Sequence, residues 1–85
     1  MNIIKMRDFE KAFRILPKDA QRLYRLQEGR FIENWRDPRL HIKKVRILPF
    51  ALSFRVTRRY RAFFYFKNAD TAVFFEIDHR KDIYR

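Results

Sequence analysis

The side chains in this chain with the greatest capacity for chemistry are cationic, and most of them lie in its second half. Lys and Arg number 21 against 10 Asp and Glu, which gives 85 residues a net charge of +11. Twelve basic and four acidic residues give 39–85 a charge of +8, whereas 1–38 carry only +3. Such a field attracts polyanions, either nucleic acid or an acidic protein. Because solubility alone favours a net charge of only about 2–8, we expect a polyanionic partner.

The chain lacks the residues that several other kinds of chemistry require. The absence of cysteine excludes disulfides, zinc fingers and thiol catalysis. Two histidines, His41 and His79, are too few for a histidine-rich metal site, and a single glycine excludes a glycine-rich phosphate loop. We therefore expect no metal and no cofactor. No apolar run approaches the ~20 residues of a membrane span, and the N-terminus does not resemble a signal peptide, which predicts a cytoplasmic protein.

The first half of the chain predicts a short strand over 2–6 followed by two helices. Within 7–16 the apolar residues recur at i, i+3, i+4 and i+7, on one helix face. A proline then suits the first turn of a second helix, 18–35, and another proline ends it. The inward face of this helix has a polar gap at Gln27. Its predicted apolar members are Ala20, Leu23, Phe31 and Trp35.

The second half predicts strands over 43–48, 52–57, 60–66 and 71–78. The last strand is almost continuously apolar, which is typical of a central position in a sheet. The order strand–helix–helix followed by strands predicts a single α+β domain over residues 1–85. In this domain the two N-terminal helices pack on one face of a mostly antiparallel sheet.

Alternation along the strands divides the sheet into two faces. The helices should cover the apolar face that carries Leu52, Phe54, Val56, Ala62, Phe64 and Phe66. The other face is predicted to be open and to mix cations with aromatic rings, in the order Ser53, Arg55, Thr57, Arg61, Phe63 and Tyr65.

Four segments occur in an informative order, LPKDAQRLYRL, DPRLHIKKVR, SFRVTRRYRAFF and IDHRKDIYR. The most telling are 53–64, with the pattern R-V-T-x-x-Y-R, and 77–85, with the pattern H-R-x-x-x-Y. In this order and spacing, over nearly the whole chain, the sequence resembles the RelE/ParE superfamily. Its members are the toxin halves of bacterial and archaeal type II toxin–antitoxin modules.

The resemblance implies a RelE-like domain, with two N-terminal helices on a small antiparallel sheet. It also implies a cognate antitoxin that wraps the toxin with a flexible, often acidic segment in a hetero-oligomer. Two branches of the superfamily differ in activity. RelE-like members bind the ribosome and cut mRNA in the A site, whereas ParE-like members inhibit DNA gyrase and tend to carry a C-terminal extension. The chain ends at Arg85, which favours the RelE-like activity.

Residue by residue, the resemblance implies metal-independent cleavage in which the 2′-OH of the RNA attacks the adjacent phosphate. Arg61 matches the family arginine that stabilises the charge on the phosphate. Arg80 matches a C-terminal arginine that contacts the phosphate or the leaving group. Tyr84 matches the aromatic residue that stacks on a base or assists the 2′-OH.

The chain departs from the best-known RelE pattern, which has two lysines on the strand before the arginine. Here Ser53 and Arg55 take those outward positions. Arginine, with a pKa above ~12, is a poor general base, and His79 is therefore the candidate base. Each residue also has a structural interpretation: Arg61 as an ion-pair partner of Asp78 or Glu76, His79 as the end of a strand, and Tyr84 as a core anchor.

Six further cations are predicted to contact RNA phosphates, or else solvent: Lys43, Lys44, Arg46, Arg55, Arg58 and Arg59. The leading hypothesis is an mRNA endonuclease. The alternatives are a ParE-like gyrase inhibitor and a nontoxic relative that binds an antitoxin, which the missing lysine pair favours. A sequence-specific DNA-binding domain fits less well, because both helices turn their apolar faces inward.

Overall fold

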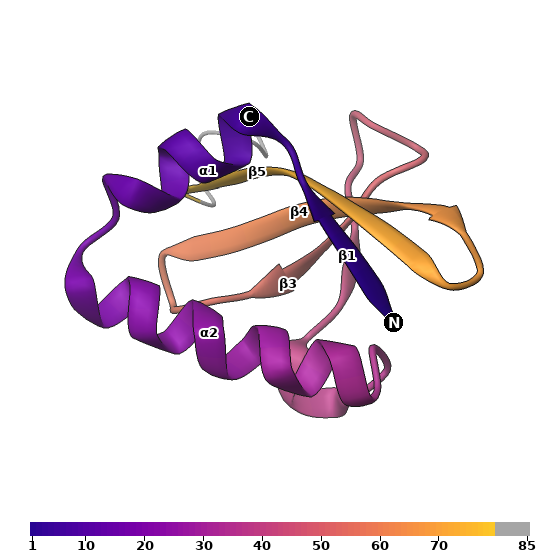
Figure 1. Cartoon of the computed structure of the whole chain (residues 1–85), viewed down its shortest axis with the longest axis horizontal. Coiled ribbons are helices and arrows are strands. Elements are labelled where there is room, and N and C mark those ends of the chain that lie inside the picture. Colours follow the sequence, from indigo (N-terminus) through magenta and orange to yellow (C-terminus); the bar gives the residue numbers. More distant parts are fainter. Residues whose placement is uncertain (80–85) are drawn as a thin grey trace.

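The computed structural model describes residues 1–79 (Figure 1). Its elements run in the order β1 (Asn2–Lys5), α1 (Arg7–Arg14), α2 (Lys18–Glu33), the 3₁₀-helix η1 (Pro38–Leu40), β2 (Lys43–Lys44), β3 (Leu52–Arg55), β4 (Tyr60–Asn68) and β5 (Thr71–His79). The strands form a sheet in the order β1-β5-β4-β3-β2. All neighbours in it are antiparallel except β1 and β5. The predicted α+β class is confirmed.

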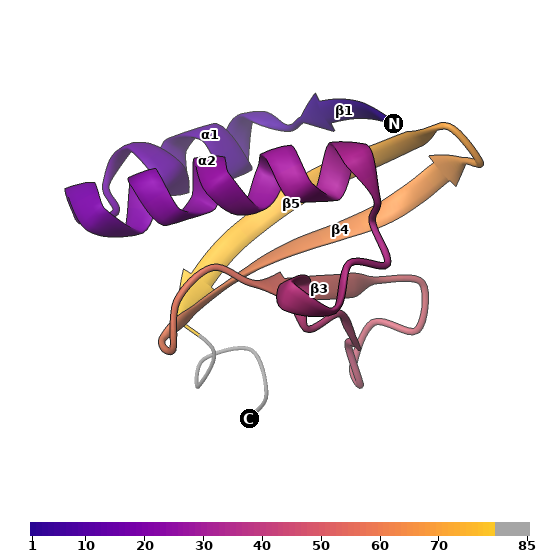
Figure 2. The same cartoon turned by 90° about the horizontal axis from the view of Figure 1, so that it is seen from below.

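Both long helices lie on the same side of the sheet (Figure 2). The core between the layers is aromatic, and Phe74 on β5 lies at its centre. The Phe74 ring is 5.2–6.4 Å, centroid to centroid, from five other rings, those of Phe9, Tyr24, Phe31, Phe54 and Phe64. β5 lies between β1 and β4, which confirms its predicted central position. Neither α1 nor α2 combines the length and apolar character needed to cross a membrane.

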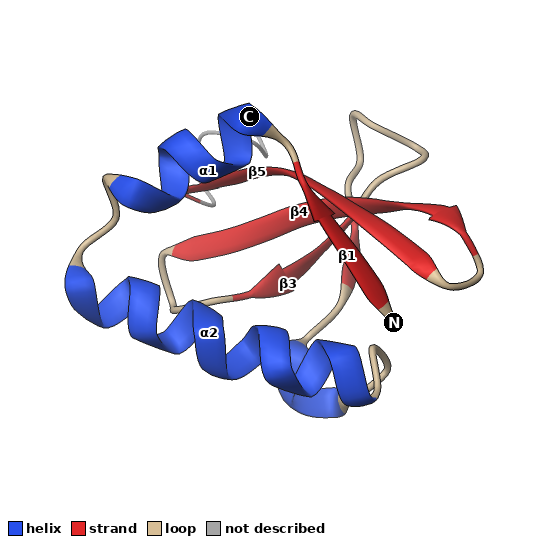
Figure 3. Ribbon diagram, in the orientation of Figure 1, coloured by secondary structure: helices blue, strands red, loops and turns tan. Residues whose placement is uncertain are grey.

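The strand predicted over 43–48 is wrong beyond its first two residues. From Val45 to Ala51 the chain folds into a loop (tan, at the upper right of Figure 3) instead of continuing along the sheet. Three backbone hydrogen bonds close this loop, from the amides of Val45, Leu48 and Ala51 to the carbonyls of Ala51, Val45 and Leu48. These bonds occupy backbone groups that a longer strand would have offered to its neighbour.

The side chain of Gln27, the polar position on the inward face of α2, packs inside the protein and joins α2 to other elements. Its side chain is 6% exposed and donates to the carbonyls of Arg39 (3.0 Å) and Arg55 (2.8 Å), while its Oε1 accepts from Arg30. One amide therefore ties α2 to η1 and to β3. The buried residues of α2 also include Tyr24, which the apolar pattern did not single out.

The expectation of an open second face is wrong for Ser53, Arg61 and Phe63, each of which is 0% exposed. The loop between β2 and β3 supplies a second apolar cluster, in which Val45 and Ala51 pack with Phe63. Alternation assigned these residues to the correct face, but it carried no information about what covers that face.

Candidate nucleic-acid interface

Arg61 is held in place on the sheet face opposite the helices. Its Nε donates to the Ser53 hydroxyl (2.8 Å), and its Nη2 donates to the carbonyls of Ser53 (3.3 Å) and His41. His41 follows η1 in a left-handed conformation (φ 49°), which is uncommon for a residue other than glycine. The guanidinium is thus fixed from β3 and from the end of η1.

Cross-strand register shows which predicted residues share this face. Arg61 pairs with Arg55 on β3 and with Asp78 on β5, and Lys43 on β2 pairs with Ser53. Because residues directly opposite in a sheet point to the same side, Lys43, Arg55 and Arg61 lie on one face, together with the carboxylate of Asp78 at its β5 edge. β3 lacks the two lysines of the RelE pattern, but β2 places one lysine, Lys43, on the same face.

His79 lies on the other side of the sheet. It pairs in register with Tyr60, and the two rings are 5.9 Å apart at 79°. With Tyr60 it lines a hollow of about 350 Å³ that Ala12 and Leu16 border on the helix side. The structure does not bring His79 and Arg61 to one face. Arg80 and Tyr84 lie outside the described residues.

The cations around the candidate site are free of acidic neighbours in the sequence. Lys43, Lys44 and Arg46 are exposed near the start of this region, and Arg58 and Arg59 are exposed in the turn between β3 and β4. Residues 38–69 include nine Lys and Arg and no Asp or Glu. A stretch of this kind attracts polyanions, although its first cation, Arg39, is already paired with Asp37 at 2.7 Å. Comparing the net charges of the two halves of the chain did not reveal this run without carboxylates. The run is the sequence feature that marks the candidate site.

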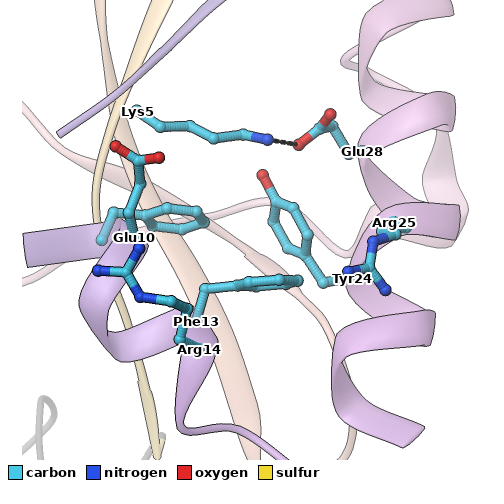
Figure 4. A pocket seen from close by; sticks show the side chains of 8 residues that line it. Lys5, Glu10, Phe13, Arg14, Tyr24, Arg25 and Glu28 are labelled. Carbon is cyan, nitrogen blue, oxygen red and sulfur yellow. Dashed lines mark ion pairs between the residues drawn. The ribbon is translucent and has the colours of Figure 1, made fainter. Parts of the chain in front are cut away.

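A second hollow, also of about 350 Å³, lies between α1 and α2 (Figure 4). Lys5 and Glu28 form an ion pair at 2.9 Å, and the Tyr24 hydroxyl points toward that pair (Figure 4). Burial, and then the adjacent Glu28 carboxylate, raise the pKa of Tyr24. Tyr24 therefore stays protonated at neutral pH and cannot serve as a base there.

Replacing Tyr24 with phenylalanine should leave the free energy of unfolding unchanged or raise it by up to about 1 kcal/mol. The hydroxyl is buried and makes no hydrogen bond of good geometry to any residue within 1–79. Its removal therefore relieves a desolvation cost without breaking a strong contact. Urea unfolding followed by circular dichroism measures the change. A loss above about 1 kcal/mol would mean that the hydroxyl has a stabilising partner.

No family model and no curated protein matches the sequence. Solved structures do match the fold. A chain of the RelB–RelE antitoxin–toxin complex from Methanococcus jannaschii has a TM-score of 0.72 and 24% identity, over 95% of this chain and 94% of that one. The YoeB/ParE toxin from Agrobacterium tumefaciens has a TM-score of 0.79 and 6% identity, over 94% and 99%. YafQ from E. coli has a TM-score of 0.78 and 9% identity, over 99% and 98%.

These proteins share the arrangement described above over nearly their whole length, at sequence identities that establish the fold alone. The RelE-like architecture expected from the sequence is confirmed. The chain therefore has the fold that these RelE, YoeB/ParE and YafQ proteins share.

Proposed function

We propose that this protein is the toxin of a type II toxin–antitoxin module and cuts mRNA in the ribosomal A site. The observation that carries the proposal is the face shared by Lys43, Arg55 and Arg61, within a stretch of the chain that has nine cations and no carboxylate. Such a face suits the phosphodiester backbone of RNA. The proposal places the protein in the cytoplasm, where ribosomes and mRNA are found.

The reaction proposed is an internal transesterification. The 2′-oxygen of one nucleotide attacks the adjacent phosphorus, and the bond from phosphorus to the 5′-oxygen breaks. The 2′-OH loses its proton and the 5′-oxygen gains one, which leaves a 2′,3′-cyclic phosphate and a 5′-OH. Fixed cations stabilise the negative charge that develops on the phosphorane.

In this proposal Arg61 stabilises the phosphorane, and Arg80 and Tyr84 keep the roles that the family resemblance implies. His79 is not used, because its ring lies beside Tyr60 on the helix side of the sheet. Arg61 is 0% exposed in this conformation. Its contact with a phosphate therefore requires the groups that cover it to move.

The proposed partner is a cognate antitoxin with an acidic, flexible segment that neutralises the same cationic face. Support comes from the M. jannaschii structure, in which a RelE toxin was crystallised with its RelB antitoxin. An acidic segment on Lys43 and Arg55 would compete with RNA directly, so that binding of the antitoxin and cleavage exclude each other.

The test is a purified translation system with ribosomes stalled on a defined mRNA, read by primer extension. The expected result is cutting only at the A-site codon and none in the same mRNA without ribosomes. A gyrase supercoiling assay runs in parallel. Intact mRNA together with blocked supercoiling would replace the proposal with a ParE-like inhibitor.

A nontoxic relative that only binds an antitoxin is the second candidate. The burial of Arg61 and its hydrogen bonds to Ser53 and His41 favour this alternative, because a structural arginine would be held in the same way. A folded protein that neither cuts mRNA nor blocks supercoiling, yet binds an acidic antitoxin, would establish it.

A further inference from the structure

The loop between β2 and β3 presents an aromatic ring to solvent. Phe50 is 62% exposed, yet its ring is 5.8 Å from that of Tyr65 on β4, at 81°, and 6.5 Å from that of Phe75 on β5. Tyr65 and Phe75 are in turn 6.1 Å apart. These three residues form an aromatic cluster, and Phe50 is its most exposed member.

Within the aromatic cluster, Phe50 is held by the loop between β2 and β3. The backbone bonds between Val45, Leu48 and Ala51 close the loop on both sides of Phe50, and the preceding Pro49 restricts the backbone further. Val45 and Ala51 are anchored in the buried cluster around Phe63. A ring supported in this way loses little conformational entropy when it contacts a ligand.

Along the chain, the charges that flank Phe50 and Tyr65 are all positive, whereas Glu76 follows Phe75. Lys43, Lys44 and Arg46 precede Phe50, Lys67 follows Tyr65, and no carboxylate occurs between residues 38 and 69. A solvent-exposed aromatic ring among cations is the combination that binds single-stranded nucleic acid, by stacking on bases and neutralising phosphates.

We propose that Phe50 is a stacking site for a base of single-stranded RNA, supported from behind by Tyr65 and Phe75. This inference rests on the proposed function, since it names how the substrate RNA is held. Arg61, Phe63 and Tyr65 alternate on one face of β4, which places the Cα atoms of Arg61 and Tyr65 about 13 Å apart. A base on Phe50 therefore belongs to the same short stretch of RNA as a phosphate at Arg61.

The same loop supplies a matched control. Ile47 is 61% exposed, almost as much as Phe50, but has no aromatic ring. A protein partner that docked on the loop would bury both apolar side chains, and either substitution would weaken it. Stacking on a base depends on the ring alone.

The experiment measures fluorescence anisotropy of a labelled single-stranded RNA of about ten nucleotides with the full-length protein. Phe50→Ala should weaken binding roughly tenfold, Phe50→Trp should retain it, and Ile47→Ala should stay within about twofold. Thermal unfolding by circular dichroism confirms that each variant is folded.

The inference is overturned if wild type does not bind the RNA, or if Phe50→Ala and Ile47→Ala weaken binding equally. It is also overturned if Phe50→Trp is as weak as Phe50→Ala, because a larger ring must preserve stacking. The readout is binding and not cutting. RNA that binds through Phe50 but stays intact on stalled ribosomes would reject the proposed nuclease and leave the stacking site standing.

Discussion

Replacing Arg61 with leucine should reduce A-site cleavage by about 10²–10³-fold or more. The variant removes the fixed guanidinium that is proposed to stabilise the phosphorane. It should also lower the free energy of unfolding by roughly 2–4 kcal/mol, because the buried acceptors on Ser53 and the partly buried carbonyl of His41 lose a charged donor. Single-turnover cleavage on stalled ribosomes measures the first effect, and urea unfolding measures the second.

Arg61→Lys separates catalysis from folding, and Arg55→Leu is a control for stability alone. Arg61→Lys retains a cation and should fold more stably than the leucine variant, but it cannot reproduce the planar fork of hydrogen bonds. Its cleavage should remain at least tenfold below wild type under conditions where unfolding curves show it folded.

Arg55→Leu is the matched control for the stability of Arg61→Leu. Arg55 is the register partner of Arg61, and its buried Nε has no hydrogen-bond partner within residues 1–79. We expect it to cost less than about 1 kcal/mol, and equal costs for Arg55→Leu and Arg61→Leu would contradict the structural role of Arg61.

Phe74→Ala should lower the free energy of unfolding by about 3–5 kcal/mol. The ring is 0% exposed and contacts five aromatic neighbours from α1, α2, β3 and β4. Removing it leaves a cavity between the layers and breaks every one of these aromatic pairs. A domain of this length has a total stability of only about 4–13 kcal/mol, so that the variant approaches the unfolding threshold. Urea unfolding at 25 °C measures the loss.

The matched control for Phe74→Ala is Phe50→Ala, the same substitution at a position that is 62% exposed. We expect it to cost less than about 1 kcal/mol, because a small loss of contact area accompanies it. If the two alanine variants lost similar amounts of stability, the aromatic core around Phe74 would not be the main source of stability.

The sequence predicted the elements that depend on periodicity. Both helices, the central position of the last strand and the layer arrangement follow from apolar spacing, which local sequence records directly. The family resemblance added a candidate role for Arg61. The elements are shorter than predicted at several ends, for example at Arg55, because Thr57 turns the chain by accepting from the amides of Arg59 and Tyr60.

The sequence could not predict what covers the second face. Alternation placed Phe63 and Arg61 opposite the helices, but Phe63 is covered by Val45 and Ala51, and Arg61 donates to the His41 carbonyl. These partners are distant along the chain. The sequence also could not predict that His79 and Arg61 lie on opposite faces of the sheet. A pattern of residue types does not reveal a strand's register, and here the register pairs His79 with Tyr60.

The most direct test of the central claim is the position and chemistry of cuts in mRNA on stalled ribosomes, for wild type and Arg61→Lys side by side. We expect cuts confined to the A-site codon that leave a 2′,3′-cyclic phosphate and a 5′-OH, at a rate at least tenfold lower in the variant. Intact mRNA with folded wild-type protein, or equal cutting by folded wild type and variant, would contradict it.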